Sequence, residues 1–140
     1  MYTSKMMIVV RRDLKMRKGK IAAQAGHACV EAALAALARE GRLSDVIWAD
    51  GFISLRPTEK PETPLSAWFQ NGTAKICVYV DSEEKLKEID RRAKEAGILS
   101  VMIRDAGMTE FHGEPTYTCL ALEPQTAGAV DPITGALPLY

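Results

Sequence analysis

Four short apolar runs stand out along the chain, and each has the length of a β-strand. The first run is apolar at every position, which is typical of a strand buried on both faces of a sheet. The runs are Met6–Val10, Ala74–Val80, Ile98–Arg104 and Tyr117–Leu122. Because helical patterns separate them, we predict an α/β fold.

Two longer stretches show the periodicity and the end signals of helices. The alanine-rich stretch, about Lys20–Arg39, is followed by Gly41, which we predict to be its C-cap. The charged stretch, about Glu83–Ala96, is amphipathic, follows Ser82 as an N-cap residue and stops at Gly97.

The second strand, the charged helix and the third strand follow one another with short joints. This order predicts a right-handed crossover and a parallel pair of strands. Ligands of open α/β sheets gather outside the carboxyl ends of the strands. Asp13 follows the first strand and Asp105 the third. If these two strands are parallel, Asp105 and Thr109 lie at the same edge as the start of the alanine-rich helix.

The segment of about Arg42–Leu65 differs from the rest of the chain in its residue pattern and is predicted to be an extended surface insertion. It contains three prolines, and Val46–Trp48 and Phe52–Leu55 flank an Asp50-Gly51 pair that suits a hairpin turn. A loop this long with two aromatic residues is more often functional or packed than idle, and the sequence does not decide between these. A short helical turn is predicted at Ser66–Gln70.

Composition favours a single intracellular domain over residues 1–140. The 140 residues are 47% hydrophobic, enough for one core. Three cysteines without a C-x-x-C pair are typical of reduced, buried thiols, and Met6–Val10 is far shorter than a signal or membrane segment. We therefore expect a cytoplasmic protein that has no membrane partner.

Charge is balanced overall but unevenly distributed. Seven of the 18 Lys and Arg residues fall between Lys5 and Lys20, and none follows Arg104. Such a basic corner can steer a polyanion to one place without making the whole surface cationic.

Polar side chains share one stripe of the predicted long helix. Lys20, Gln24 and His27 are offset by zero, four and seven residues, so they lie on one face. A cation, an amide and an imidazole would suit a polar ester and its phosphate. A histidine on a helix face is more often structural, however, and Asp105 at a strand end is as often a turn or cap residue.

Two other chemistries are disfavoured. Cys29 lies two residues from His27, so the two side chains diverge on a helix and do not form a thiol nucleophile with its base. His112 has no partner at metal-ligand spacing. We therefore predict neither a metal nor another cofactor.

Three segments resemble, in order, the motifs of the type-two peptidyl-tRNA hydrolases. They are KMMIVVRRDLKMRKGKIAAQAGHACVEA, AWFQNGTAKICVYVDSEEKL and IRDAGMTEFHGEPTYTCLAL, and AVDPITGALPLY is similar to the family's closing residues. The likeness covers nearly the whole chain except about Arg42–Leu65, which looks longer than usual.

The resemblance implies hydrolysis of the ester between a peptide and the terminal ribose of tRNA, as in translation and ribosome rescue. It implies one domain with a mixed, partly parallel four-stranded sheet sandwiched between helices. The functional positions of the family map onto Lys20, Gln24, His27, Asp105 and Thr109. We expect tRNA phosphates to contact Arg11, Arg12, Lys15, Arg17 and Lys18.

Ester chemistry suggests roles for these residues. His27 would activate the water and Asp105 would orient its ring. Lys20 and Gln24 would face the oxyanion or the terminal phosphate, and Thr109 would hold the water or the carboxylate. The sequence leaves open which residue is the base and which the oxyanion donor.

Three questions stay open at this point. The alternative function is a non-catalytic tRNA- or RNA-binding or interaction module on the same fold. The sequence also leaves the oligomeric state open, and a homodimer is the candidate. Phe111 and Trp48 are the candidates for stacking on the terminal adenine.

Overall fold

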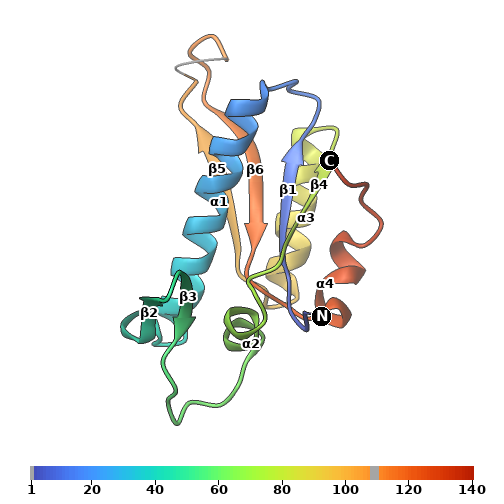
Figure 1. Cartoon of the computed structure of the whole chain (residues 1–140). Helices are drawn as coiled ribbons and strands as arrows, with labels where there is room; N and C mark the ends of the chain where they lie inside the picture. Colours follow the sequence, from blue (N-terminus) through green and yellow to red (C-terminus); the bar gives the residue numbers. More distant parts are fainter. Residues whose placement is uncertain (1, 108–110) are drawn as a thin grey trace.

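A computed structural model describes residues 2–107 and 111–140. Its regular elements follow one another as strands and helices, with a short 3-10 helix η1 after the longest helix (Figure 1). They are β1 (Met6–Arg11), α1 (Lys18–Arg39), η1 (Leu43–Asp45), β2 (Val46–Ala49), β3 (Phe52–Leu55), α2 (Pro64–Gln70), β4 (Lys75–Val80), α3 (Glu83–Glu95), β5 (Ser100–Asp105), β6 (Thr116–Leu122) and α4 (Ala127–Thr134).

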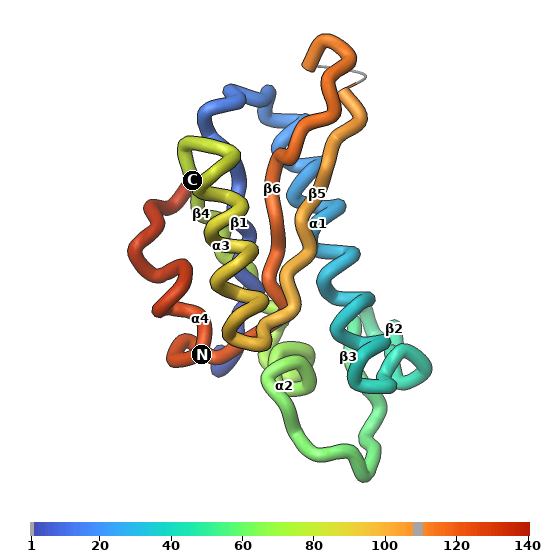
Figure 2. Tube along the Cα trace, turned by 180° about the vertical axis from the view of Figure 1, so that it is seen from behind, coloured from blue at the N-terminus to red at the C-terminus, as the bar shows by residue number. Residues whose placement is uncertain are grey.

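The main sheet has four strands in the order β4-β1-β6-β5. Strands β1 and β4 are parallel, and β6 is antiparallel to both of its neighbours. Helix α1 covers one face, while α3, with α4 packed beside it, covers the other (Figures 1 and 2). The predicted α/β fold with a mixed, partly parallel four-stranded sheet between helices is therefore confirmed.

The two strands that α3 connects are parallel, as predicted, but they do not pair with each other. Strands β4 and β5, which α3 connects, run in the same direction but form the two edges of the sheet, and the parallel neighbours are β1 and β4. The physical reason is burial. Strands β1 and β6 are buried along almost their whole length and lie at the centre of the sheet. Strands β4 and β5 are half-buried, as suits strands at the edges of a sheet.

Each face of the sheet has its own hydrophobic core. Alternate residues of β1 point to opposite faces, with Ile8 in the core under α1 and Val9 in the core under α3. On α1 the buried positions include Ala28, Ala32 and Ala36, whose small side chains let the helix approach the sheet closely. Burying this stripe of α1 leaves its polar stripe beside the sheet edge.

Helix α1 begins at Lys18, two residues before the predicted start, so Gly19 lies inside its first turn. It ends as predicted, with Gly41 at a positive φ of 68° just after its last turn. By length and composition alone α1 could cross a membrane, a test that core helices of soluble proteins also pass. Here it packs against β6, β5 and β1.

The segment after α1 forms the predicted hairpin. Strands β2 and β3 are antiparallel, and both Asp50 and Gly51 have positive φ, as a type I′ turn requires. The hairpin leaves Trp48 73% and Phe52 60% exposed.

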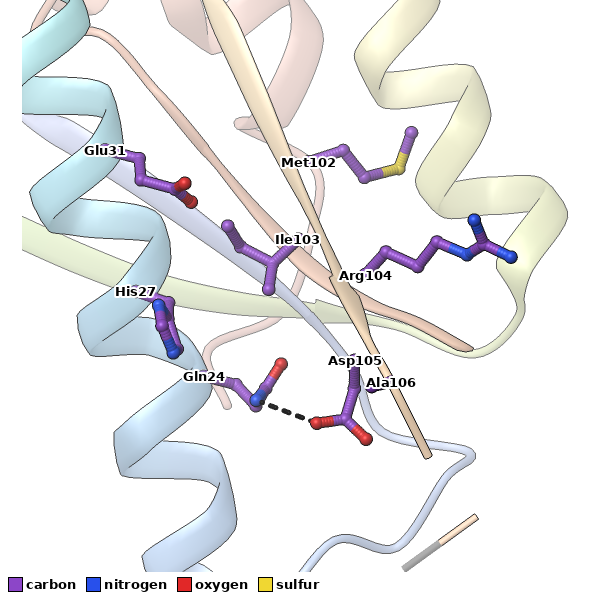
Figure 3. A pocket seen from close by; sticks show the side chains of 8 residues that line it. All are labelled: Gln24, His27, Glu31, Met102, Ile103, Arg104, Asp105 and Ala106. Atoms are coloured by element: carbon purple, nitrogen blue, oxygen red, sulfur yellow. Dashed lines mark hydrogen bonds between the residues drawn. The ribbon is translucent and has the colours of Figure 1, made fainter. Parts of the chain in front are cut away.

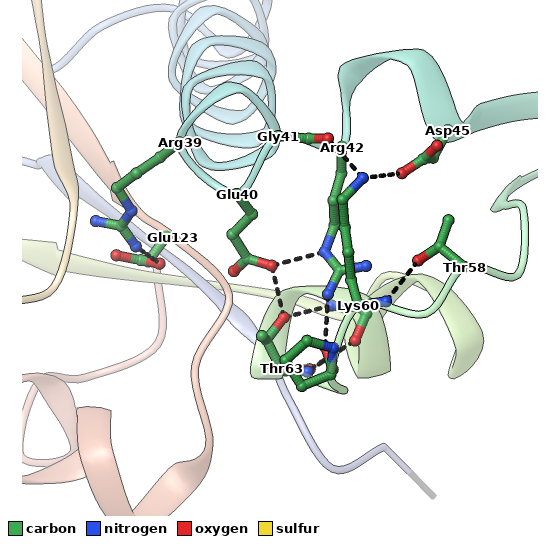
Figure 4. Close-up of polar contacts among 11 residues, drawn as sticks. Arg39, Glu40, Gly41, Arg42, Asp45, Thr58, Lys60, Thr63 and Glu123 are labelled. Carbon is green, nitrogen blue, oxygen red and sulfur yellow. Dashed lines mark hydrogen bonds and ion pairs between the residues drawn. The ribbon is translucent and has the colours of Figure 1, made fainter.

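A polar network connects the segment around this hairpin to the end of α1 (Figure 4). Arg42 is buried and donates to Glu40 and to the carbonyl of Pro61, and Lys60 donates to the carbonyl of Gly41 and to Asp45. Residues 42–63 are thus tied to the end of α1.

Helix α4 was not predicted. Pro132 lies inside it and Gly128 in its first turn, so its local sequence favours a loop. Val130 and Ile133 are nevertheless buried against α3 and the sheet, and this tertiary contact outweighs the poor propensity.

Candidate active site

The polar stripe of α1 reaches the carboxyl end of β5. Lys20 is half-buried, Gln24 is 5% exposed and His27 is exposed. Asp105 is the last residue of β5 and faces this stripe (Figure 3). The prediction that Asp105 emerges beside the start of the long helix is confirmed, because β1 and β5 run in the same direction.

Three donors hold the Asp105 carboxylate. Lys20 Nζ lies 2.7 Å and Gln24 Nε2 3.4 Å from Oδ1, and the backbone N–H of Gly107 donates to Oδ2 at 2.8 Å. The hydrogen bond from Lys20 is the main cause that lowers the pKa of Asp105, and the Gly107 N–H and the charges of Lys20 and His27 lower it further. Asp105 is therefore a carboxylate at neutral pH.

Gln24 is fixed from both ends of its amide. Its Nε2 donates to Asp105, and its Oε1 accepts a hydrogen bond of 2.6 Å from the hydroxyl of Thr118. Because Gln24 and Thr118 are both buried, this amide has one orientation, with the nitrogen toward the carboxylate.

Thr118 reaches Gln24 because of a β-bulge. Ile103 pairs with Cys119 and Arg104 with Tyr117, so Thr118 is an extra residue in β6. Thr118 and Cys119 consequently both contact α1, where strict alternation would send one of them to the other face. Sequence reasoning missed Thr118, and no turn residue or glycine in this strand signals the bulge.

His27 lies at the mouth of a pocket of about 330 Å³ between α1 and β5. The pocket is lined by Gln24, His27, Glu31, Met102, Ile103, Arg104, Asp105 and Ala106 (Figure 3). Within the described residues His27 makes no hydrogen bond, and Asp105 pairs with Lys20 instead. The orienting role of Asp105 toward His27 stays a prediction. Thr109, the remaining predicted site residue, lies outside the described residues.

The predicted phosphate-binding residues fall into two groups. Arg12, Lys15, Arg17 and Lys18 are exposed around the loop between β1 and α1. Arg11 differs, because its guanidinium donates to Asp13 and to the carbonyl of Tyr117 and faces Glu83 at 3.8 Å. The Arg11 side chain is therefore engaged within the protein, and the phosphate role stays a prediction for all five residues.

The two stacking candidates lie far apart. Phe111 is next to the site, with its ring centroid 5.9 Å from Lys20 Nζ. Trp48 belongs to the hairpin, which lies at the opposite end of α1 from the start of that helix (Figure 1). The structure therefore brings only Phe111 of this pair to the site.

The cysteines remain thiols. Burial raises the pKa of Cys29, which is half-buried, and raises the pKa of Cys119 to about 12. Neither supports a thiolate nucleophile at neutral pH. Over residues 2–107 and 111–140, no cluster of three His, Cys, Asp or Glu side chains could hold a metal ion.

Comparison with known proteins identifies full-length relatives. Residues 4–140 match the family described as peptidyl-tRNA hydrolase PTH2. The chain is 37% identical over 139 residues to a peptidyl-tRNA hydrolase of Thermococcus onnurineus, covering 99% of each protein. It is 39% identical over 135 residues to one of Methanothermobacter thermautotrophicus, covering 96% of this chain and 98% of the relative.

Two further similarities differ from these in coverage or in kind. A probable peptidyl-tRNA hydrolase 2 of Drosophila melanogaster is 39% identical over 135 residues, which cover 96% of this chain and 61% of the relative. A solved structure of a protein of unknown function from Agrobacterium matches 100% of this chain and 99% of its own, with a TM-score of 0.57 and 14% identity. That last similarity concerns the fold alone.

Proposed function

Because the chain belongs to the peptidyl-tRNA hydrolase PTH2 family, we propose that it hydrolyses the ester between a peptide and the terminal ribose of tRNA. The observation that carries the proposal is the convergence of Lys20 and Gln24 of α1 on Asp105 of β5, beside a pocket that Gln24, His27 and Asp105 line. Together these residues offer a cation, an oriented amide and an accessible imidazole, which are groups that ester hydrolysis can use.

His27 is the proposed general base. Its imidazole accepts a proton from water while the water oxygen attacks the ester carbonyl, and the carbonyl oxygen becomes an oxyanion. When the intermediate collapses, the carbon–oxygen bond to the ribose breaks and the imidazolium returns the proton to the ribose oxygen. Exposure of His27 at the pocket mouth supports this role, because the ring can contact a bound substrate.

Lys20 and Gln24 are the proposed electrostatic partners of the reacting ester. Asp105 holds the ammonium of Lys20 and receives the Gln24 amide, so both donors stay in place before substrate arrives. Asp105 itself stays ionised and hydrogen-bonded, which makes it a positioning residue for Lys20.

The tRNA would approach over the loop between β1 and α1. Arg12, Lys15 and Lys18 are exposed in or next to this loop. The loop lies at the same end of the molecule as the carboxyl end of β5 (Figure 1), where Asp105 is the last residue. Phosphates of the acceptor end would contact these cations, and binding would weaken as salt rises.

A single-turnover assay tests the proposal. The wild-type protein is expected to release N-acetyl-aminoacyl groups from tRNA, and His27→Ala to lower the rate by about 10²–10⁴-fold, the usual contribution of a general base. His112→Asn, at the only other histidine, is the matched control and should retain activity.

The outcomes separate the two function classes. If wild type and the His27→Ala variant cleave the ester at the same rate, the role of His27 as general base is refuted. Binding of tRNA without cleavage by wild type would favour the alternative, a non-catalytic tRNA-binding module on the same fold.

Two further expectations follow from this function. We propose that the protein works in the cytoplasm, where translation supplies peptidyl-tRNA. A homodimer also stays a proposal, and light scattering of the purified protein would decide it.

A further inference from the structure

The candidate pocket lies along the outer edge of β5. Five consecutive residues, 102–106, line it. Ile103 belongs to the core under α1, whereas Met102 packs toward the core under α3 and Arg104 lies over the Tyr117 ring. Side chains of a strand alternate between the two faces of the sheet, so a pocket on one face would be lined by every second residue only. The pocket therefore borders the backbone edge of the strand (Figure 3).

That edge offers main-chain hydrogen-bonding groups. Strand β5 is the last strand of the sheet and pairs with β6. Within the described part of the chain, no other backbone group bonds to residues 100–105 from the outer side. Such an edge can pair with an extended peptide.

We propose that the outer edge of β5 binds the peptide moiety of the substrate, which joins the sheet as an additional strand. This inference rests on the proposed function, because the position of the ester comes from it. In this arrangement the ester lies next to Asp105 and His27, at one end of the pocket. The rest of the pocket extends along β5 from Asp105 toward Met102.

The direction of the bound peptide follows from its chemistry. The esterified residue is the carboxyl end of the peptide and lies at Asp105, the carboxyl end of β5. The peptide therefore runs parallel to β5. Residues Met102 to Asp105 provide a subsite of about four residues, each about 3.3 Å long.

The other wall of this subsite is α1. Gln24, His27 and Glu31, spaced by three and four residues, face the pocket from one side of the helix. Main-chain pairing would let such a site accept peptides of different sequence, because nearly every residue of a peptide carries the same N–H and C=O groups. An aminoacyl-tRNA without a peptide bond lacks these groups and loses this binding.

Peptide length provides the first test. N-acetylated alanine chains of one to six residues, esterified to the same tRNA, are compared by kcat/KM. We expect kcat/KM to rise by about 2- to 10-fold for each hydrogen bond gained, the usual net value of such a bond, and to level off near four residues. Equal kcat/KM for all lengths would overturn the inference.

N-methylation of the peptide provides the sharper test. In a parallel pair, the N–H and C=O groups of every second residue point to the neighbouring strand. Methylation of these residues should lower kcat/KM by about 2-fold or more, and methylation of the residues between them should have little effect. The unaffected positions are the matched control, because they carry the same methyl group. A loss without this alternation would contradict strand pairing.

Hydrogen exchange keeps the inference testable apart from catalysis. A tRNA acceptor-stem mimic that carries a tetrapeptide through an amide instead of the ester should slow exchange of alternate amides of residues 100–105. A mimic that carries only an acetylated residue should not. Absence of the slowing would refute the subsite. Failure of wild type to cleave any ester would refute the proposed function, while the exchange result would still decide whether peptides bind this edge.

Discussion

The hydroxyl of Thr118 donates a 2.6 Å hydrogen bond to Oε1 of Gln24, 94 residues away in the chain. Both residues are buried, and the bond determines which end of the Gln24 amide faces Asp105. Replacement of Thr118 by Val keeps the shape of the side chain but leaves Oε1 without its donor. We expect a loss of about 1–3 kcal/mol in the free energy of unfolding and a lower rate of ester cleavage. Urea unfolding and single-turnover kinetics measure the two effects.

Thr118→Ser is the control for this prediction, because it retains the hydroxyl. A Val variant as stable and as active as the Ser variant would show that the bond does not position Gln24.

Lys20 determines the ionisation of Asp105. Lys20→Met removes the hydrogen bond that is the main cause of the lowered pKa, so the Asp105 pKa should rise toward its ordinary value near 3.8. Carboxyl chemical shifts in an NMR titration measure this pKa. Lys18→Met, two residues earlier and exposed, should leave it unchanged. The rate of ester cleavage by Lys20→Met should fall by about 10²–10³-fold if Lys20 is an oxyanion donor.

Stability should depend on pH through the same carboxylate. A group whose pKa is lower in the folded than in the unfolded state stabilises the fold above its unfolded pKa. Wild type should therefore exceed Asp105→Asn in unfolding free energy by a constant amount at neutral pH. This difference should shrink as pH falls below about 3.8 and through the lowered folded pKa. Urea unfolding at several pH values tests this, and a difference that grows on acidification would contradict the ion pair.

Arg11 and Arg12 are neighbours in sequence but should respond differently to substitution. Arg12 is exposed, with its guanidinium 4.6 Å from the centroid of the Tyr79 ring, so Arg12→Ala should weaken tRNA binding and reduce the salt dependence by about 0.7–0.9 in slope. Arg11 is bonded within the protein, so Arg11→Ala should lower thermal stability first. Equal effects of the two substitutions on the salt slope would contradict this division.

Arg42 anchors the segment that follows α1. It is buried and donates hydrogen bonds to Glu40 and to the carbonyl of Pro61. Arg42→Ala should therefore lower the unfolding free energy by about 3–5 kcal/mol, because Glu40 and this carbonyl lose the cation that pairs with them. The control is Arg56→Ala. The Arg56 side chain is 57% exposed and lies 3.9 Å from Asp45, so this change should cost less than about 1 kcal/mol. Chemical unfolding of both variants makes the comparison.

The sequence by itself determined the local elements and one side of the site. The hydrophobic periodicity and the end signals predicted four strands and the two longer helices to within a few residues. These signals come from residues that are close together in the sequence. The stripe of Lys20, Gln24 and His27 was equally predictable, since helix geometry alone places residues i, i+4 and i+7 on one face. The Asp50-Gly51 turn was predictable because few residues adopt positive φ.

Tertiary structure alone decided the rest. The order β4-β1-β6-β5 depends on which strands the two helical layers bury, and α4 forms against α3 despite Pro132. The bond from Thr118 to Gln24 and the bond from Arg11 to the carbonyl of Tyr117 connect residues 94 and 106 positions apart. Such contacts form only when the sheet is assembled, because they depend on register and packing between distant segments. No local pattern in the sequence records them.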